Sequence, residues 1–399
     1  MSKLAVNNLY KIFGPSPQRG LELIKQGLGK DEILRKTGLT VGVNDANFSV
    51  EEGEVFVIMG LSGSGKSTLV RCLNRLIDPT HGEIRLDGED ILKLSTAELR
   101  EIRRKKMSMV FQNFGLLPNR TVLANVEYGL EIQGIDKGER SEKATESLRK
   151  VGLKGYEDSY PDQLSGGMKQ RVGLARALAN DPEILLMDEA FSALDPLIRG
   201  DMQDELLELQ ADMQRTIIFI THDLDEALKL GDRIMLMKDG RTVQTGTAEE
   251  ILTNPADEYV RRFVQGVNRS DVLSARDIMA KPLATISITQ GPRLALKEMR
   301  EHNIESIFVL DQKRRLAGAV VIDDVSQAIE QGKKSVEDIV QEDINTVTPD
   351  TNISDLIQLT LNSPVPLAVV DEKNRLAGVI IKGSVLEAMI PEGGTEDAE

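Results

Sequence analysis

Glycines, hydroxyl side chains and one lysine are concentrated between residues 60 and 68, a combination that suits phosphate binding. The run follows a short apolar stretch, 55–59, and precedes a helical segment that starts near Lys66. Glycines let backbone N–H groups approach phosphate oxygens, and a helix N-terminus favours negative charge. We expect Lys66 to reach the β- and γ-phosphates of a nucleotide and the Ser67 hydroxyl to bind Mg²⁺. The predicted nucleotide-binding residues are Gly60, Ser62, Gly63, Ser64, Gly65, Lys66, Ser67 and Thr68.

Two consecutive carboxylates, Asp188 and Glu189, follow a second apolar run at 184–187. In an open α/β sheet, ligands bind at the carboxyl ends of the strands. Asp188 is therefore expected to orient Mg²⁺ through water, and Glu189 to polarise the attacking water as a general base. The alternative is that these acidic residues merely end a strand. The presence of a phosphate loop makes this alternative the weaker of the two.

The elements that position these groups can be predicted from the apolar pattern. Apolar runs at 55–59, 107–111, 183–187 and 216–221 alternate with helical segments, which predicts a mostly parallel sheet covered by helices. No such run occurs within 120–180, so we expect a helical subdomain at about 115–180.

A further insertion is expected near the N-terminus. Strands are predicted at 1–14 and 46–50, with a helical insertion at about 15–40 between them. Asp31 is expected to cap its second helix, which would end at Gly38. The basic side chains of the insertion suit either a solvated helical face or contact with anionic lipid. The neighbouring acidic residues favour the solvated face.

The run Leu164-Ser165-Gly166-Gly167-Met168-Lys169-Gln170 precedes a helical segment. The residues alone predict only a turn before a helix. Together with the phosphate loop and the carboxylate pair, in this order, the run resembles the signature of ABC-transporter nucleotide-binding domains. The resemblance implies ATP as the nucleotide and a head-to-tail dimer. In that dimer, one copy's signature residues would contact the γ-phosphate held by the other copy: Ser165, Gly166, Gly167 and Gln170.

Three more residues match landmarks of the same family. Gln112 corresponds to the glutamine that senses Mg²⁺ and water and faces the membrane subunits, and Asp195 ends the loop that crosses the dimer interface. His222 corresponds to the histidine that contacts the γ-phosphate and positions Glu189, although a lone histidine after a strand is more often structural.

Phe13 is the candidate for stacking on adenine, with a core role as the alternative and Tyr10 as the second choice. The resemblance thus implies an ATPase with Lys66, Glu189 and His222 as catalytic residues. It also implies Mg²⁺ held by three side chains: Ser67, Gln112 and Asp188.

The C-terminal third contains an internal repeat. Val309-Leu310-Asp311 recurs as Val369-Val370-Asp371, and Arg315-Leu316-Ala317-Gly318 recurs as Arg375-Leu376-Ala377-Gly378. Two copies of one unit usually pack together to bury a shared face. The repeat resembles a tandem pair of CBS domains, at 270–333 and 334–390, with an acidic tail at 391–399 that is expected to be disordered.

The CBS resemblance implies regulation. Such pairs often bind adenine nucleotides, and cyclic di-AMP is one candidate ligand. An ordinary ribose contact is possible only at Asp324. A purely structural or dimerising role is the alternative.

Composition and charge limit the classes of partner and the location that the protein can have. The 399 residues carry a formal net charge of −15, which argues against nucleic acid as a partner because phosphate neutralisation needs clustered basic residues. There is one cysteine, Cys72, no signal peptide, and no apolar stretch near the ~20 residues that a spanning helix needs. We therefore expect a peripheral protein on the cytoplasmic face of the plasma membrane.

From about residue 3 to 388 the chain closely resembles the ATPase subunits of glycine betaine/proline betaine/carnitine importers. The resemblance implies an osmoprotectant importer regulated through its CBS domains during osmotic stress. Its partners would be transmembrane permease subunits, a solute-binding protein or domain, and a second copy of itself. The alternatives are an importer ATPase for another small solute and a non-transport ABC ATPase.

Overall fold

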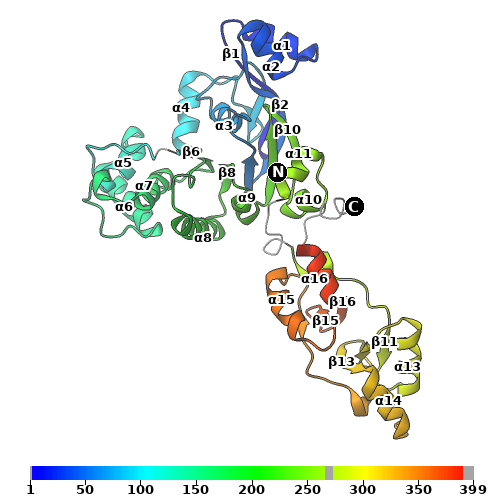
Figure 1. The fold of residues 1–399 in the computed structure, drawn as a ribbon. Helices are drawn as coiled ribbons and strands as arrows, with labels where there is room; N and C mark the ends of the chain where they lie inside the picture. The colour runs from blue at the N-terminus through cyan, green and yellow to red at the C-terminus, as the bar shows by residue number, and fades with distance from the viewer. Residues whose placement is uncertain (1, 113, 266–272, 390–399) are drawn as a thin grey trace. The chain divides into compact units, whose positions relative to one another are not determined.

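The computed structural model describes residues 2–112, 114–265 and 273–389. The chain divides into two compact units, 1–264 and 265–399, each of which is considered by itself (Figure 1). The predicted tail at 391–399 lies outside the described residues.

A six-stranded sheet forms the centre of the first unit, in the order β10-β9-β3-β8-β7-β6. All neighbours are parallel except β10, which pairs antiparallel with β9. Every residue of β3, β7 and β8 is buried, which is why these strands read as continuous apolar runs. The predicted mostly parallel sheet is confirmed. Its strands are β3 (Val55–Met59), β6 (Met107–Val110), β7 (Ile184–Asp188), β8 (Thr216–Thr221), β9 (Arg233–Lys238) and β10 (Arg241–Gly246).

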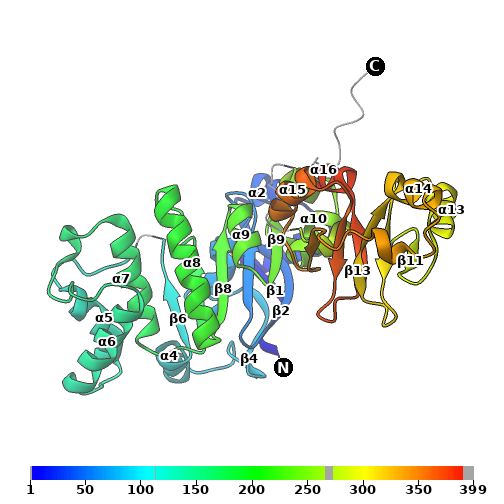
Figure 2. The same ribbon diagram turned by 90° about the horizontal axis from the view of Figure 1, so that it is seen from below.

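Helices complete this α/β core, and Figure 2 shows α8 and α9 alongside β8. Asp195 caps α8 and Asp223 caps α9, each accepting a backbone N–H with its side chain. The core helices are α3 (Lys66–Leu73), α4 (Thr96–Lys105), α8 (Pro196–Met213), α9 (Leu224–Leu230), α10 (Ala248–Thr253) and α11 (Glu258–Val264).

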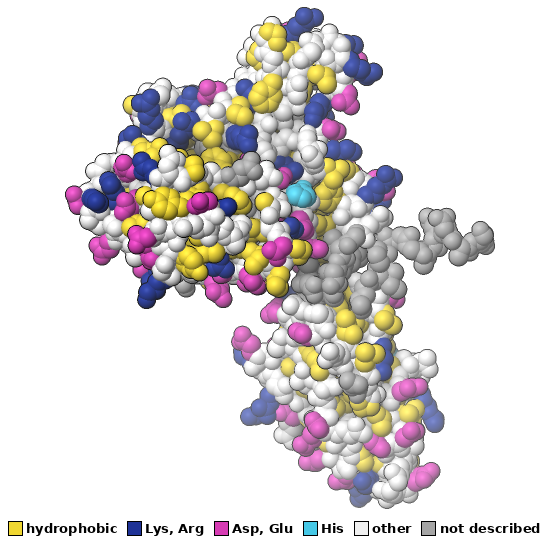
Figure 3. Space-filling view, turned by 60° about the vertical axis from the view of Figure 1, so that its left-hand side comes forward, with side chains coloured by type: hydrophobic (Ala, Val, Ile, Leu, Met, Phe, Trp, Pro, Cys, Tyr) yellow, Lys and Arg dark blue, Asp and Glu magenta, His cyan; other side chains and the backbone are white. Residues whose placement is uncertain are grey.

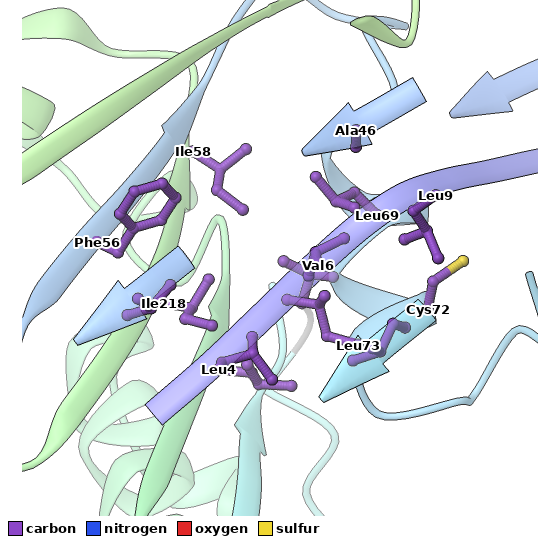
Figure 4. Packing of buried hydrophobic residues seen from close by; sticks show 14 of the residues in the cluster. Leu4, Val6, Leu9, Ala46, Phe56, Ile58, Leu69, Cys72, Leu73 and Ile218 are labelled. Carbon is purple, nitrogen blue, oxygen red and sulfur yellow. The ribbon is translucent and has the colours of Figure 1, made fainter. Parts of the chain in front are cut away.

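An antiparallel sheet with the order β2-β1-β4-β5 packs on the core. Apolar side chains of β1 gather with those of α3 and β3 in one buried cluster, part of which appears in Figure 4. Cys72 is buried there, and burial raises the pKa of its thiol to about 12, so it acts as a small apolar residue. The strands are β1 (Ser2–Phe13), β2 (Thr40–Glu51), β4 (His81–Leu86) and β5 (Glu89–Asp90).

Two helices connect β1 to β2: α1 (Pro17–Lys25) and α2 (Lys30–Thr37). Leu21, Ile24 and Ile33 are buried against these strands. Gly38 ends α2, as predicted, and adopts the left-handed conformation. The predicted cap was wrong: Gly29 occupies the cap position with no side-chain hydrogen bond. Asp31 lies instead in the first turn, where its charge favours the helix dipole.

Between β6 and β7 the described residues form helices joined by turns and irregular segments, with no strand. The elements are α5 (Val122–Ile132), α6 (Lys137–Lys150), the 3₁₀ helix η1 (Pro161–Gln163) and α7 (Gly166–Leu178). They pack side by side at one end of the unit in Figure 1. Asn125 stabilises the entry to α5, because its buried amide bonds to backbone groups of Leu117, Arg120 and Thr121.

The second unit contains two similar three-stranded sheets, β11-β12-β13 and β14-β15-β16. The registers repeat: Val309 pairs with Gly318, and Val369 pairs with Gly378. The first half comprises α12 (Ala275–Ile278), β11 (Thr285–Ser287), α13 (Pro292–Glu301), β12 (Ser306–Leu310), β13 (Leu316–Val321) and α14 (Ile322–Glu330). The second comprises η3 (Val336–Ile339), β14 (Thr346–Val347), α15 (Ile353–Asn362), β15 (Leu367–Val370), β16 (Leu376–Ile380) and α16 (Lys382–Met389).

A shared apolar cluster joins the two sheets and includes Phe308, Leu316, Val365 and Ala368. In addition, the two halves exchange their first segments. Ala280, which follows α12, pairs with Val379 of the second half, and Gln341, which follows η3, pairs with Ala319 of the first. The hydrophobic cores follow the exchange: 273–279 packs with 347–388, whereas 284–340 is continuous.

Among the described helices, none has the length and apolar character required to cross a membrane.

Candidate functional site

The phosphate loop connects β3 to α3. Gly65 precedes α3 at φ +104, and a Cβ there would lie 2.1 Å from the Gly42 carbonyl oxygen, so only glycine fits. The Lys66 ammonium donates to the Gly60 carbonyl at 2.7 Å and is almost fully buried. Burial lowers the pKa of Lys66, while the Glu189 and Asp188 carboxylates oppose the shift. A phosphate group would provide further negative charge for this cation.

Ser67 and Asp188 lie side by side. The Ser67 hydroxyl donates to the Asp188 carboxylate at 2.8 Å, and an Arg71 guanidinium nitrogen lies 3.3 Å from the other oxygen of that carboxylate. A hydroxyl and a carboxylate are oxygen ligands of the kind that Mg²⁺ prefers. These two residues therefore fit a Mg²⁺ ion that accompanies the nucleotide.

Glu189 is the centre of the second group. Its carboxylate lies 3.8 Å from the Lys66 ammonium, 3.6 Å from His222 Nδ1 and 3.3 Å from Gln112 Nε2. Its backbone adopts φ +48, a strained conformation that costs of order 1–3 kcal/mol. Hydrogen bonds from the Glu189 N–H to Ile220 O and from Ser192 Oγ to Glu189 O hold that conformation. The predicted residues Gln112, Glu189 and His222 are thus brought together.

A cavity of about 360 Å³ lies beside these groups. Phe13, 38% exposed, forms part of its wall, as expected of an aromatic side chain that stacks on adenine. Tyr10 packs instead with the apolar cluster of the insertion and does not line the cavity. The predicted residues among its lining are Phe13, Ser62, Gly63, Gly65, Lys66, Ser67, Thr68 and Glu189. Ser64 is buried, and its hydroxyl has no partner among the described residues.

Four residues of this wall were not predicted from the sequence: Lys30, Thr40, Val41 and Gly42. Lys30, from the insertion, lines the cavity and donates to the Gly63 carbonyl at 2.9 Å. Gly42 lies under Phe13, because a Cβ there would be 2.9 Å from the ring. Lys30 sits beside Asp31 and Glu32 in sequence, so no local pattern separates it from an ordinary surface lysine.

The signature residues lie at the start of α7. Ser165 caps the helix by accepting from the Met168 N–H at 3.3 Å, and Gly166 is exposed. A Cβ on Gly167 would lie 2.7 Å from Ile198, so the signature packs against the start of α8. Gln170 differs, because it is only 1% exposed and its amide has no hydrogen-bond partner among the described residues.

In the second unit, the predicted contact residue Asp324 already has a partner. Its carboxylate accepts a 2.9 Å hydrogen bond from the Gln341 amide. Gln341 belongs to the exchanged segment that pairs with Ala319. A ribose hydroxyl at Asp324 would therefore compete with this contact.

Comparison with known proteins identifies both units. Residues 43–192 match the ABC transporter family, and residues 275–331 and 336–391 each match the CBS domain. The glycine betaine/carnitine transport ATP-binding protein of Listeria monocytogenes is 57% identical over 98% of each chain. The glycine betaine transport ATP-binding protein of Bacillus subtilis is 56% identical, over 97% of this chain and 92% of the relative. The glycine betaine/proline betaine transport system ATP-binding protein ProV of Salmonella typhimurium is 54% identical over 98% of each chain.

Solved structures agree with this assignment. The ATP-binding cassette MJ0796, a dimer in a post-hydrolysis state with ADP and Pi, has a TM-score of 0.52 and 33% identity. The match covers 61% of this chain and 98% of that one. The chain therefore belongs to the ABC transporter family, as an ATP-binding protein that carries two CBS domains.

Proposed function

We propose that this chain is the ATPase subunit of an importer for quaternary-amine osmoprotectants such as glycine betaine, and that it works as a head-to-tail dimer. The observation that carries the ATPase mechanism is the grouping of Lys66, Gln112 and His222 around the Glu189 carboxylate, with each contact at 3.8 Å or less. Substrate class is supported by the names of relatives at 54–57% identity over nearly the whole chain.

Each residue has a separate task in hydrolysis. The phosphate loop and Lys66 hold the β- and γ-phosphates, and Ser67, Gln112 and Asp188 would hold Mg²⁺, which neutralises developing charge on the phosphates. Glu189 accepts a proton from the attacking water. His222 contacts the γ-phosphate and orients Glu189.

The dimer places the signature of each copy over the nucleotide of the other. Ser165 and Gly166 are exposed at the start of α7, where backbone N–H groups suit a phosphate. Leu61 in the phosphate loop is 59% exposed and Leu197, two residues after Asp195, is 76% exposed. Contact with a second copy would remove these apolar side chains from water.

The permease subunits dock, we propose, at a groove of about 240 Å³ between the core and the helical subdomain. Phe111, next to Gln112, and Tyr128 line it, and both are more than one-third exposed. Figure 3 shows hydrophobic side chains gathered on one face of this unit. A short amphipathic segment of the membrane subunit fits such a groove, which would hold the chain at the cytoplasmic face of the plasma membrane. A solute-binding protein or domain would deliver the osmolyte from outside.

The CBS pair regulates this cycle by binding an adenine nucleotide, for which cyclic di-AMP is the first candidate. The test is titration calorimetry of cyclic di-AMP and AMP into the full-length chain and its Asp324→Asn variant. Micromolar binding supports the proposal, and weaker binding to the variant places the site at Asp324. If neither nucleotide binds, a salt-sensing or dimerising role replaces nucleotide sensing.

The Glu189→Gln variant tests the ATPase mechanism. Without the base, hydrolysis should fall by about 10²–10⁴-fold while ATP still binds, so the dimer accumulates. Size-exclusion chromatography with light scattering should show an ATP-dependent doubling of mass. A variant that hydrolyses ATP at the native rate would remove Glu189 from the base role.

Osmolyte specificity needs a separate test, because no described residue of this chain is proposed to contact the solute. Uptake of glycine betaine, carnitine and choline by the reconstituted importer would decide between the proposed substrate class and another small solute.

A further inference from the structure

One guanidinium connects the two loops on which the catalytic cycle depends. Arg199 lies in the first turn of α8, and its Nη2 donates to the Leu194 carbonyl at 3.2 Å. Its Nη1 lies 3.2 Å from the Asp223 carboxylate. Leu194 immediately precedes Asp195, and Asp223 immediately follows His222. The loop 192–195, here called the dimer loop, and the segment that follows His222 are therefore both contacted by the Arg199 side chain.

Asp223 forms hydrogen bonds through both its backbone and its side chain. Its backbone N–H donates to Thr221 Oγ1 at 2.9 Å, and its Oδ1 caps α9 by accepting from the Glu226 N–H at 3.3 Å. The other carboxylate oxygen accepts from Arg199. Because Asp223 is joined by a peptide bond to His222, a shift of its carboxylate moves the histidine backbone.

A second contact ties the same helices one turn further along. Gln203 Nε2 donates to Glu226 Oε1 at 3.2 Å, and both side chains are buried. This contact is a second link between α8 and α9.

The histidine is close to its partner but short of a strong hydrogen bond. His222 Nδ1 lies 3.6 Å from Glu189 Oε2, outside the usual 2.7–3.2 Å range for an N–H···O bond. A displacement of less than about 1 Å would close that gap, and a misplacement of that size can change a rate by about 100-fold.

We infer that Arg199 is a positioning residue: it transmits the docking of the Asp195 loop in the dimer to His222 and so aligns His222 with Glu189. Arginine suits this task because its planar fork contacts a carbonyl and a carboxylate at once and remains charged at all relevant pH values. The inference rests on the proposed head-to-tail dimer, which supplies the force on the Asp195 loop.

The chain offers a matched control. Lys229 of α9 pairs with Asp204 of α8 at 2.6 Å, so it joins the same two helices. Asp204 is 63% exposed, and neither residue contacts the dimer loop or His222 in the described contacts. A variant that lacks this pair loses an α8–α9 ion pair but not the path to the histidine.

The experiment compares steady-state ATP hydrolysis by the full-length chain and its variants. Arg199→Met should lower kcat by about 10- to 100-fold, with KM for ATP changed less than about twofold, because alignment rather than nucleotide binding is lost. Lys229→Met should retain native kcat and KM. Arg199→Lys should recover part of the lost kcat, since lysine keeps the positive charge but lacks the planar guanidinium.

Asp223→Asn provides a second variant in case Arg199→Met folds poorly. Asparagine keeps an oxygen that caps α9 but loses the charge that Arg199 contacts. It should reproduce the kcat loss, and the Arg199→Met/Asp223→Asn double variant should be no slower than the slower single variant. Native kcat in either single variant, an additive double variant, or an equal loss in Lys229→Met would overturn the inference.

A test of dimer formation distinguishes a failure of this inference from a failure of the proposed function. In the Glu189→Gln background, Arg199→Met should still form the ATP-dependent dimer, because the inference concerns alignment after docking. Failure of Glu189→Gln alone to dimerise counts against the proposed function. Loss of the dimer only when Arg199→Met is added assigns Arg199 to the interface and contradicts the inference.

Discussion

The Ser67 hydroxyl and the Asp188 carboxylate are joined by a 2.8 Å hydrogen bond although 121 positions separate them in sequence. The bond connects the start of α3 to the end of β7. Two oxygen groups suited to one Mg²⁺ ion are thus adjacent before any ligand arrives. The free energy needed to bring the two groups together is supplied by folding of the parallel sheet and not by nucleotide binding.

Asp188→Asn tests this arrangement. The variant should bind Mg²⁺ with ATP about 10- to 100-fold more weakly, the range seen when residues that orient metal ligands are changed. Titration of Mg²⁺ at fixed ATP measures the effect, with Asp181→Asn, an exposed partner of Arg215, as control. Unchanged Mg²⁺ dependence would separate Asp188 from the metal.

His222→Ala tests the histidine. We expect the variant to abolish transport and to lower hydrolysis strongly, because Glu189 loses its orienting partner, while ATP affinity stays within about twofold. His222 is 56% exposed, so the substitution leaves no cavity in the core. Uptake in vesicles and ATP binding are the two measurements, and normal uptake would contradict the assignment.

Lys30→Ala tests whether the insertion takes part in nucleotide binding. The loss of an ammonium from the cavity should raise KM for ATP by about tenfold, equivalent to a charged hydrogen bond of about 1.5 kcal/mol, with kcat retained. Lys36→Ala removes the same charge from the same helix, where Lys36 pairs with Glu32 and is 58% exposed. Equal KM values for the two variants would make Lys30 an ordinary surface residue.

Glu226→Gln tests the effect of a buried carboxyl on stability. Burial raises the pKa of Glu226, although hydrogen bonds from Thr221 and Gln203 oppose this. Because the folded state holds the proton more tightly than the unfolded state, this contribution to stability is lost as pH rises above the ordinary glutamate range. The variant should therefore unfold at a higher temperature than wild type near neutral pH, with the difference shrinking toward pH 5. A constant difference across that range would contradict the raised pKa.

Gly318→Ala and Gly378→Ala form a matched pair in the two sheets. A Cβ at Gly318, where φ is +150, would lie 2.2 Å from the backbone oxygen of Gln341, whereas at Gly378 it would lie 2.7 Å from the Met279 sulfur and 2.9 Å from Met279 Cβ and Cγ. The first variant should cost at least about 2 kcal/mol more in free energy of unfolding than the second, because backbone cannot move aside as a methionine can. Denaturant titration measures both, and equal losses would refute the difference.

The sequence predicted the parts of this protein that depend on local pattern. Continuous apolar runs identified β3, β7 and β8, and glycine spacing identified the phosphate loop, because both follow from rules that act within a few residues. The resemblance then supplied the pairing of His222 with Glu189, whereas the contact between Gln112 and Glu189 came from the structure.

Features set by tertiary contacts could not be predicted. Nothing in the sequence near Lys30 or Arg199 indicates the Gly63 carbonyl or the Asp223 carboxylate that each one reaches. Burial of Gln170 depends on how α7 packs, and the competing helix start at Gly29 displaced Asp31 from the cap position. For Lys30 and Arg199 the deciding partner comes from another element.

The exchange of first segments gives the C-terminal unit an order of assembly during synthesis. The core of the first half is one continuous stretch, 284–340, whereas the second half needs 273–279 together with 347–388. A ribosome therefore delivers every residue of the first core before the second can close. Segment 273–279 has no β16 to pack against until β16 has been synthesised. The core of the first half is therefore complete while the domain that surrounds it in sequence is still being synthesised.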